Sequence, residues 1–400
     1  ALVVAALIAL DVVLAPSPRR LLLEREVAPS VRLGEPCTST VTVTNTGSRR
    51  ARGLLRDAWQ PSAGAGQDRH RIDVPPGERR RTSTQLRPVR RGDRAADRVT
   101  VRLPGPLGVA ARQASLPLPG RLRVLPPFTS RRHLPSRLAR LRELDGRTAV
   151  LHRGQGTEFD ALRDYVDGDD VRSIDWRATA RRQTVVVRTW RPERDRRVLL
   201  VLDASRTAAA RIGQEVRLDA GIEASLLLGA LASRAGDRVD LLVHGRAVRT
   251  RVRGASRARL LGELVEALAP LEPELVETDW DAVVAEIRTT ARQRCLVVLL
   301  TALDSAAVEV GLLPVLGQLT ARHTVVVASV DDPSLRRLAA GRGDVDAVYP
   351  AAAAEAAAAE RAATAELLTR MGVEVVHAPP ADLAPALADR YLHLKAAGRL

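Results

Sequence analysis

The chain has 400 residues, of which 46% are hydrophobic and 27% are charged. These fractions are typical of globular proteins, and they exclude a wholly disordered chain, a collagen-like repeat and a protein made of many membrane helices. Single hydrophobic cores stop growing at about 250 to 300 residues, so the length predicts two or more domains.

The net charge is +15, from 62 basic and 47 acidic residues. Such an excess often indicates binding to nucleic acid or to an anionic membrane. Here nearly all basic residues are arginines, with Lys395 as the single lysine, and acids are interspersed with them. Aromatic residues, which would stack on bases, make up only 2%. We attribute the charge to a preference for arginine codons and expect no specific nucleic-acid partner.

The chain begins with the apolar run Ala1–Ala15. Because about 20 residues are needed to span a bilayer, residues 1–20 are interpreted as the end of a transmembrane helix. A signal peptide is the alternative, but its basic residues would precede the apolar part, whereas Arg19 and Arg20 follow it. The positive-inside rule then places the later residues in the cytoplasm. Asp11 is expected to reach the membrane interface.

Residues 21–127 contain short strand-like runs between turn sequences. Thr38–Thr44 alternates threonine and valine, the period of a half-buried strand. Proline- and glycine-containing turns follow at Asn45–Gly47, Pro75–Gly77 and Pro104–Pro106. Regular short strands of this kind predict a β-sandwich, which would serve as a spacer or docking module.

Residues 128–196 are interpreted as a linker followed by a distinctive polar segment. Within Phe128–Gly146, leucines at positions 134, 138, 141 and 144 have helical spacing, which predicts a connecting helix.

From residue 197 to residue 400, continuous apolar runs alternate with amphipathic stretches. This pattern predicts a doubly wound α/β domain, in which helices cover both faces of a mainly parallel sheet. The predicted strands end at Asp203, His244, Val252, Thr301, Val330, Tyr349 and Ala378. The alanine-rich stretch Ala351–Ala365 is predicted to be helical. Such sheets bind ligands at the carboxyl ends of their strands.

An acid and two hydroxyls follow the first of these strands. Asp203, Ser205 and Thr207 stand at alternate positions on the turn, so their oxygens can point at one spot. Hard oxygen ligands of this kind suit Mg²⁺ or Mn²⁺. The pattern resembles the metal-ion-dependent adhesion site of von Willebrand factor A domains, Asp-x-Ser-x-Ser, with Thr207 in the last position.

This resemblance implies two further ligands, a threonine from a later loop and an acid after a later strand. Thr278 fits the first role and Asp304 the second, although that family usually places its acid where this chain has Ala302. The implied cofactor is Mg²⁺ or Mn²⁺, or none if the site is degenerate. In the alternative interpretation Asp203 caps the next segment, and the two nearby hydroxyls bind backbone groups in the turn.

The polar segment before residue 197 carries the most specific motif. It reads GQGTEFDALRDY at 154–165, continues as GDDVRSIDW at 168–176, and is followed by Ala180-Arg181. The motif strongly resembles the domain of unknown function 58 family, which implies a prokaryotic, membrane-anchored protein with a von Willebrand factor A-like domain. Further similarities to that family extend over essentially the whole chain, at Val74–Glu78, Arg90–Gly92, Met371–Val375 and Tyr391–Lys395.

Acidic and basic residues are interleaved in this motif, an arrangement that permits bidentate arginine–carboxylate pairs. We interpret it as a recognition surface for a partner protein. The candidate partner-binding residues are Glu158, Arg163, Asp164, Asp169, Arg172, Asp175, Trp176 and Arg181. The alternative is a structural clasp that holds the segment to the sheet, with Tyr165 and Trp176 as apolar anchors.

These observations predict a membrane-anchored, non-enzymatic protein-interaction scaffold. Family resemblance implies a MoxR-type AAA+ ATPase and membrane proteins as partners, in systems that assemble or activate other proteins. The chain has no Walker motif, so ATP-driven work would come from the partner. Two alternatives stay open: a hydrolase that uses a metal at Asp203, and an exported adhesin with the opposite topology. Against the hydrolase, no set of nucleophile, base and orienting residue stands out.

Overall fold

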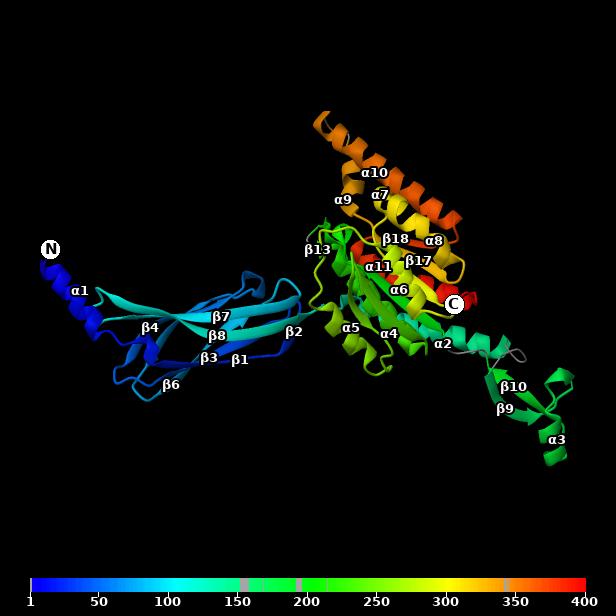
Figure 1. Cartoon of the computed structure of the whole chain (residues 1–400), viewed down its shortest axis with the longest axis horizontal. Coiled ribbons are helices and arrows are strands. Elements are labelled where there is room, and N and C mark those ends of the chain that lie inside the picture. The colour runs from blue at the N-terminus through cyan, green and yellow to red at the C-terminus, as the bar shows by residue number, and fades with distance from the viewer. Residues whose placement is uncertain are drawn as a thin grey trace. The chain divides into compact units, whose positions relative to one another are not determined.

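The computed structural model of the chain describes residues 2–151, 158–167, 169–191, 196–213, 215–341, 343 and 345–400. For residues 145–151, 158–161, 188–191 and 345 it describes only the backbone. The chain forms two compact units, one of residues 1–127 with 268–271 and one of residues 128–267 with 272–400. Figure 1 labels the helices and strands of both units.

The first unit begins with an apolar helix, α1 (Leu2–Leu14), which a short 3-10 turn follows at Pro18–Arg20. The helix ends before the proline-rich sequence at residues 16–18, because proline cannot continue a helical hydrogen-bond ladder. By length and composition Leu2–Arg20 is apolar enough to cross a membrane, with a mean hydropathy of 1.8 and only 17% of it buried in the protein. Its apolar side chains therefore lack the packing that a core helix has.

The rest of this unit consists of two β-sheets. The smaller sheet has the order β1 (Leu21–Val27), β3 (Cys37–Asn45) and β6 (Arg79–Leu86). The larger has the order β2 (Ser30–Arg32), β8 (Ala111–Leu125), β7 (Gly92–Pro104), β4 (Ala51–Trp59) and β5 (Arg69–Val74). Val41 and Val43 of β3 share one buried cluster with Leu55 of β4 and Val101 of β7. The sheets thus pack face to face, and alternate residues of β3 are buried as its sequence predicts.

The second unit contains a six-stranded sheet. Its order is β15 (Val248–Val252), β14 (Arg238–His244), β11 (Arg197–Asp203), β16 (Leu296–Leu300), β17 (Thr324–Val330) and β18 (Glu374–Ala378). All neighbouring strands are parallel except β15, which is antiparallel to β14. The strands β12 (Arg211–Ile212) and β13 (Glu215–Val216) pair as a short hairpin. The helices that accompany the sheet are α4 (Arg217–Arg234), α5 (Leu260–Leu268), α6 (Trp280–Thr290), α7 (Ser305–Ala307), α8 (Leu313–Thr320), α9 (Pro333–Ala339), α10 (Val345–Arg370) and α11 (Pro380–Ala396).

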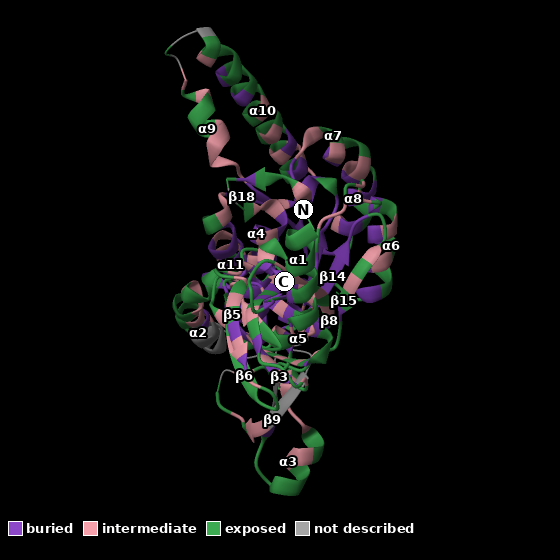
Figure 2. Cartoon of the chain, turned by 90° about the vertical axis from the view of Figure 1, so that its left-hand side faces the viewer, coloured by how far each residue is buried: buried purple, intermediate pink, exposed green. Residues whose placement is uncertain are grey.

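Helices cover both faces of this sheet, which explains its continuous apolar strands. On one face, Leu199 and Val201 of β11 share a buried cluster with Trp280 and Ile287 of α6. On the other face α4 lies so close that a Cβ added at Gly221 would be 2.8 Å from Leu202 Cδ1. Figure 2 shows the strands of this unit as largely buried, while long stretches of α10 are exposed. Strands that are buried on both faces in this way read as nearly continuous apolar runs.

The prediction of a strand that ends at Tyr349 is wrong. Residues 346–349 belong to the first turns of α10, which continues through the alanine-rich stretch. Alanine has the highest helix propensity, so the long run extends the helix toward its amino end. Val348 and Tyr349 are also exposed, whereas a strand inside this sheet would bury them.

The polar segment forms a small hairpin of its own. Helix α2 (Leu134–Leu151) precedes it, and β9 (Glu158–Asp164) pairs antiparallel with β10 (Val186–Arg191). Between these strands lie a 3-10 turn at Val171–Ser173 and helix α3 (Trp176–Arg182).

Candidate functional site

The strand order of the large sheet reverses at β11. From this strand the sheet continues through β14 to β15 on one side and through β16 to β18 on the other. In open α/β sheets the connections leave such a point in opposite directions and open a crevice at the carboxyl ends of the strands. Asp203 is the last residue of β11, and Thr301 directly follows β16. Both residues therefore border the crevice.

The carboxylate of Asp203 is buried and accepts four hydrogen bonds. Its Oδ1 accepts from the Ser205 backbone N–H at 2.9 Å and from the Thr278 hydroxyl at 2.7 Å. Its Oδ2 accepts from the Thr207 hydroxyl at 3.0 Å and from the Thr301 hydroxyl at 2.7 Å. The Ser205 and Thr207 hydroxyls also lie 3.2 Å apart. Three segments of the chain, the turn at residues 203–207 and the segments that contain Thr278 and Thr301, thus converge on one carboxylate.

All four of these donors are uncharged. In the described part of the chain no arginine or lysine nitrogen lies within 4.0 Å of the Asp203 carboxylate. Hydroxyl and amide dipoles offset part of the cost of burying a charge, but none of these donors carries a positive charge of its own. A carboxylate in this environment is a candidate for binding a cation.

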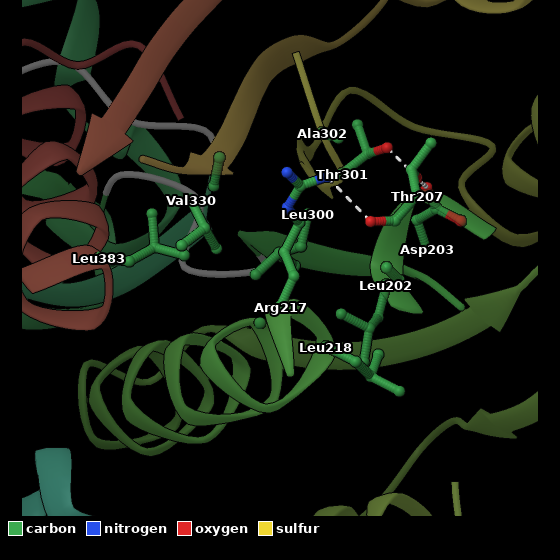
Figure 3. A pocket seen from close by; sticks show the side chains of 13 residues that line it. Leu202, Asp203, Thr207, Arg217, Leu218, Leu300, Thr301, Ala302, Val330 and Leu383 are labelled. Atoms are coloured by element: carbon green, nitrogen blue, oxygen red, sulfur yellow. Dashed lines mark hydrogen bonds between the residues drawn. The ribbon is translucent and has the colours of Figure 1, made fainter. Parts of the chain in front are cut away.

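A small cavity lies beside Asp203, and Figure 3 shows the side chains around it. Its volume of about 20 Å³ is close to what one water molecule or a small ion requires. Asp203, Thr207 and Thr301 supply polar lining, and leucines, alanines and a valine supply most of the rest. Arg217, the first residue of α4, also lines the cavity and donates from Nη1 to the Thr207 carbonyl at 2.8 Å.

Four of the five predicted metal ligands come together here: Asp203, Ser205, Thr207 and Thr278. The structure does not bring Asp304 to them. Its Oδ2 lies 3.6 Å from Arg217 Nη1, and Ala302, not an acid, lines the cavity.

The alternative interpretation of the turn is realised in part. Asp203 does accept the Ser205 backbone N–H, as a capping residue would. However, the Ser205 and Thr207 hydroxyls contact each other, and the Thr207 hydroxyl donates to Asp203.

Sequence reasoning missed Thr301 and Arg217. A signal for Thr301 was present, because it is a polar residue at the carboxyl end of an apolar strand, the same pattern that pointed to Asp203. No comparable signal marks Arg217, one of many arginines in the chain, whose role depends on where α4 begins.

The donor set fits a hard divalent cation in ligand type. It offers one carboxylate and a group of hydroxyls, the oxygen ligands that Mg²⁺ and Mn²⁺ accept. It contains a single acid, and no cluster of three or more His, Cys, Asp or Glu with metal-binding geometry occurs among the described residues. Such a site would bind a cation weakly and leave most coordination positions to water or to an outside ligand.

Three of the eight candidate partner-binding residues are engaged within the hairpin itself. Arg163 binds Asp169 with two hydrogen bonds of 2.7 and 2.6 Å, and this contact raises the pKa of the Arg163 guanidinium. Asp175 caps α3 by accepting from the Arg177 and Ala178 backbone N–H groups, each at 3.0 Å. These residues stabilise the hairpin, as the clasp interpretation predicts.

The other described candidates are exposed: Asp164, Arg172, Trp176 and Arg181. The side chain of Glu158 lies outside the described residues. Trp176 is 69% exposed, so it does not serve as the apolar anchor that the clasp interpretation requires, and Tyr165 is half-buried. Val166 and Val171 are exposed as well. The hairpin therefore presents apolar side chains among charged ones.

Comparison with protein families gives a match to the family described as "Protein of unknown function DUF58" over residues 161–365, just over half of the chain. The chain belongs to the DUF58 family. The matched region begins in β9 and ends in α10, so it contains most of the hairpin and the Asp203 site. Curated relatives include uncharacterized proteins of Mycobacterium bovis and Mycobacterium tuberculosis, 28% identical over 182 residues. The alignment covers 45% of this DUF58 chain and 56% of each relative.

Solved structures resemble this DUF58 protein only distantly. The CARDB domain of a Pyrococcus furiosus protein has a TM-score of 0.18 and 13% identity, and covers 26% of this chain and 90% of that one. An alpha-2-macroglobulin from Escherichia coli has a TM-score of 0.21 and 16% identity, and covers 28% of this chain and 17% of that one. Likeness at this level carries no information about function.

Proposed function

We propose that this DUF58 protein is a membrane-anchored, non-enzymatic scaffold that binds other proteins through a von Willebrand factor A-like α/β unit. The observation that carries the proposal is the buried carboxylate of Asp203, which borders a cavity and has only uncharged hydrogen-bond donors. This arrangement suits a cation that a partner could share. The strand order of the sheet and the Asp-x-Ser-x-Thr sequence also support a von Willebrand factor A-like unit.

In this proposal Asp203, Ser205, Thr207 and Thr278 hold Mg²⁺ or Mn²⁺. The ion would supply a positive charge at the protein surface, to which a carboxylate of a partner protein could bind. The residues of this chain position the ion, and the hydrogen bonds that they donate hold the Asp203 carboxylate in place. Because only one ligand is an acid, we expect affinity for the free ion in the millimolar range.

Thermal unfolding with and without metal tests this site. At about ten times the Kd, a ligand that binds only the folded state stabilises it by about 1.4 kcal/mol. For a unit of this size, MgCl₂ or MnCl₂ should raise the Tm by about 3 to 5 °C. The Asp203→Asn variant should lose this metal-dependent increase, whatever its own Tm is.

Asp279→Asn is the matched control. Asp279 lies next to Thr278 but caps α6, accepting from the Ala282 backbone N–H at 2.9 Å, and asparagine caps helices equally well. This variant should keep the full metal response. Absence of any response in the wild-type chain at millimolar metal would reject the metal site.

A second part of the proposal concerns the hairpin of β9, α3 and β10. Its exposed tryptophan, valines and charged residues have the composition of a protein interface, in which aromatic and arginine residues contribute most of the binding energy. We propose a MoxR-type AAA+ ATPase as the partner, with the DUF58 protein facing the cytoplasm. The family resemblance and the position of Arg19 and Arg20 after α1 support this assignment.

Affinity purification from the native membrane, with and without ATP, followed by mass spectrometry, tests the partner. The wild-type chain should recover an AAA+ ATPase. Trp176→Ala should reduce its recovery at least tenfold, because loss of a central tryptophan costs about 2 kcal/mol or more. Tyr349→Ala, which removes another exposed aromatic residue from the same unit, should not. Repeated absence of an ATPase under crosslinking would reject the assignment.

A further inference from the structure

The buried carboxylate of Asp11 links α1 to the turn between β7 and β8. Its Oδ1 accepts from the Leu107 backbone N–H, and its Oδ2 accepts from the Ala110 backbone N–H, both at 2.8 Å. Asp11 is fully buried, and a Cβ added at Gly105 would overlap with it. These two hydrogen bonds fix the position of the β7–β8 turn relative to the last turn of α1. Only glycine, which has no side chain, fits at position 105.

This turn also exposes two apolar side chains. Leu107 and Val109 are 51% and 57% exposed. They lie on either side of Gly108, which adopts φ +72°, a left-handed conformation that glycine favours. Exposed leucine and valine at the tip of a hairpin gain little stability from the fold, and they would gain it in an apolar environment outside the protein.

The surroundings of the turn point to a phospholipid bilayer as that environment. The neighbouring helix exposes apolar residues on all sides, among them Leu7, Ile8 and Leu10 in the turns before Asp11. Basic residues follow directly: Arg49 donates from Nη1 to the Val13 carbonyl at 2.7 Å, and Arg19 is exposed. Apolar residues bordered by arginines are typical of the boundary between acyl chains and phosphate headgroups.

We propose that the β7–β8 turn is a second membrane-contacting element, which inserts Leu107 and Val109 into the interfacial layer of the bilayer that α1 enters. Asp11 acts as a positioning residue that holds the turn at the level of the membrane boundary. Two attachment points would hold the sandwich in a fixed orientation on the membrane, whereas a helix alone would let it swivel. This inference rests on the proposed membrane anchoring by α1.

A depth measurement on the full chain tests the proposal. An environment-sensitive fluorophore is attached to Leu107→Cys in a Cys37→Ser background, and the chain is reconstituted into vesicles of phosphatidylcholine and phosphatidylglycerol. The remaining thiol, Cys295, does not compete for the label, because burial raises its pKa to about 12. Val89→Cys is the matched control. Val89 is exposed in the loop before β7, and the 13 residues of that strand separate it from the turn by about 40 Å.

We expect lipid-attached quenchers to quench the label at position 107 severalfold more than the label at position 89, and aqueous iodide to show the reverse preference. Equal iodide quenching at both positions would overturn the proposal. A label at position 107 that is shielded from both quenchers would also overturn it, because a protein would then cover the turn. Failure of the chain to float with vesicles would reject the membrane anchor itself, and the insertion of the turn with it.

The Asp11→Asn variant separates positioning from anchoring. Asparagine has one acceptor oxygen in place of two, so one of the bonds to the turn is lost, while α1 becomes less polar and remains able to insert. Flotation should persist, and iodide quenching at position 107 should rise severalfold. Unchanged quenching would show that Asp11 does not position the turn.

Discussion

The β-sandwich and the α/β unit each bury an aspartate, and they satisfy it differently. In the sandwich, Asp57 receives two hydrogen bonds from Arg25, at 2.7 and 3.1 Å, and one from Trp59 Nε1 at 3.1 Å. The Arg25 guanidinium also lies over the Trp59 ring, 5.1 Å from its centroid. In the α/β unit, Asp203 receives hydrogen bonds from three hydroxyls and one amide only.

This difference distinguishes the carboxylate of Asp57, which has a charged partner inside the sandwich, from that of Asp203, for which we propose a binding role. Asp57 and Arg25 neutralise each other, and the remaining contacts fix their geometry, so nothing outside the sandwich is needed. Asp203 also accepts several hydrogen bonds but has no charged donor among them, and it lies at the edge of the sheet where ligands of α/β proteins bind. Burial of a carboxylate alone therefore does not indicate a binding site. The sign and number of the charges around the carboxylate are the better indication.

Replacing each aspartate by asparagine should reveal the difference. Asp57→Asn leaves the Arg25 guanidinium buried without an anion, which should cost about 3 to 5 kcal/mol of unfolding free energy. Asp203→Asn keeps an acceptor oxygen, and three of its four donors are hydroxyls that can rotate, so it should cost about 1 to 3 kcal/mol. Urea denaturation of the full chain measures both values, with separate transitions if the units unfold independently.

The comparison fails if the two substitutions lower the free energy of unfolding by the same amount. A loss at Asp203 as large as that at Asp57 would indicate that the hydroxyl cluster is a structural clasp, as the alternative interpretation of the turn supposes. A small loss at Asp57 would mean that Arg25 reaches solvent in the variant.

Most of the α/β unit could be predicted from its sequence, because strands buried on both faces are nearly continuous apolar runs. The predicted runs that end at Asp203 and His244 are strands β11 and β14. The run predicted to end at Thr301 is strand β16, which ends one residue earlier. The prediction of a strand at residues 346–349 was wrong, because four residues carry too little periodicity to outweigh the helix propensity of the alanine run that follows.

The candidate site could be predicted only where local sequence determines it. Asp203, Ser205 and Thr207 lie in one turn, so their spacing was informative. Thr301 and Arg217 reach the same place from β16 and α4, and their proximity depends on strand order and helix position. Asp304 was placed by analogy, and in the structure it contacts Arg217 instead of the other predicted ligands. Likewise the contact of Asp11 with the β7–β8 turn joins residues nearly 100 positions apart.

Arg217 should weaken the proposed cation site, and its removal gives the subtlest prediction. Its guanidinium lines the cavity and pairs with Asp304, so its charge should repel a metal ion there. Arg217→Gln should lower the Mg²⁺ concentration needed for half of the Tm increase by about threefold to tenfold, since one unit charge a few ångströms away is worth about 1 kcal/mol or more at a protein surface. Arg234→Gln removes the same charge from the other end of α4, about 26 Å away, and should change little. If Arg217→Gln weakens the metal response, the arginine supports the site through its bond to the Thr207 carbonyl, and the charge of Asp203 is not what attracts the ion.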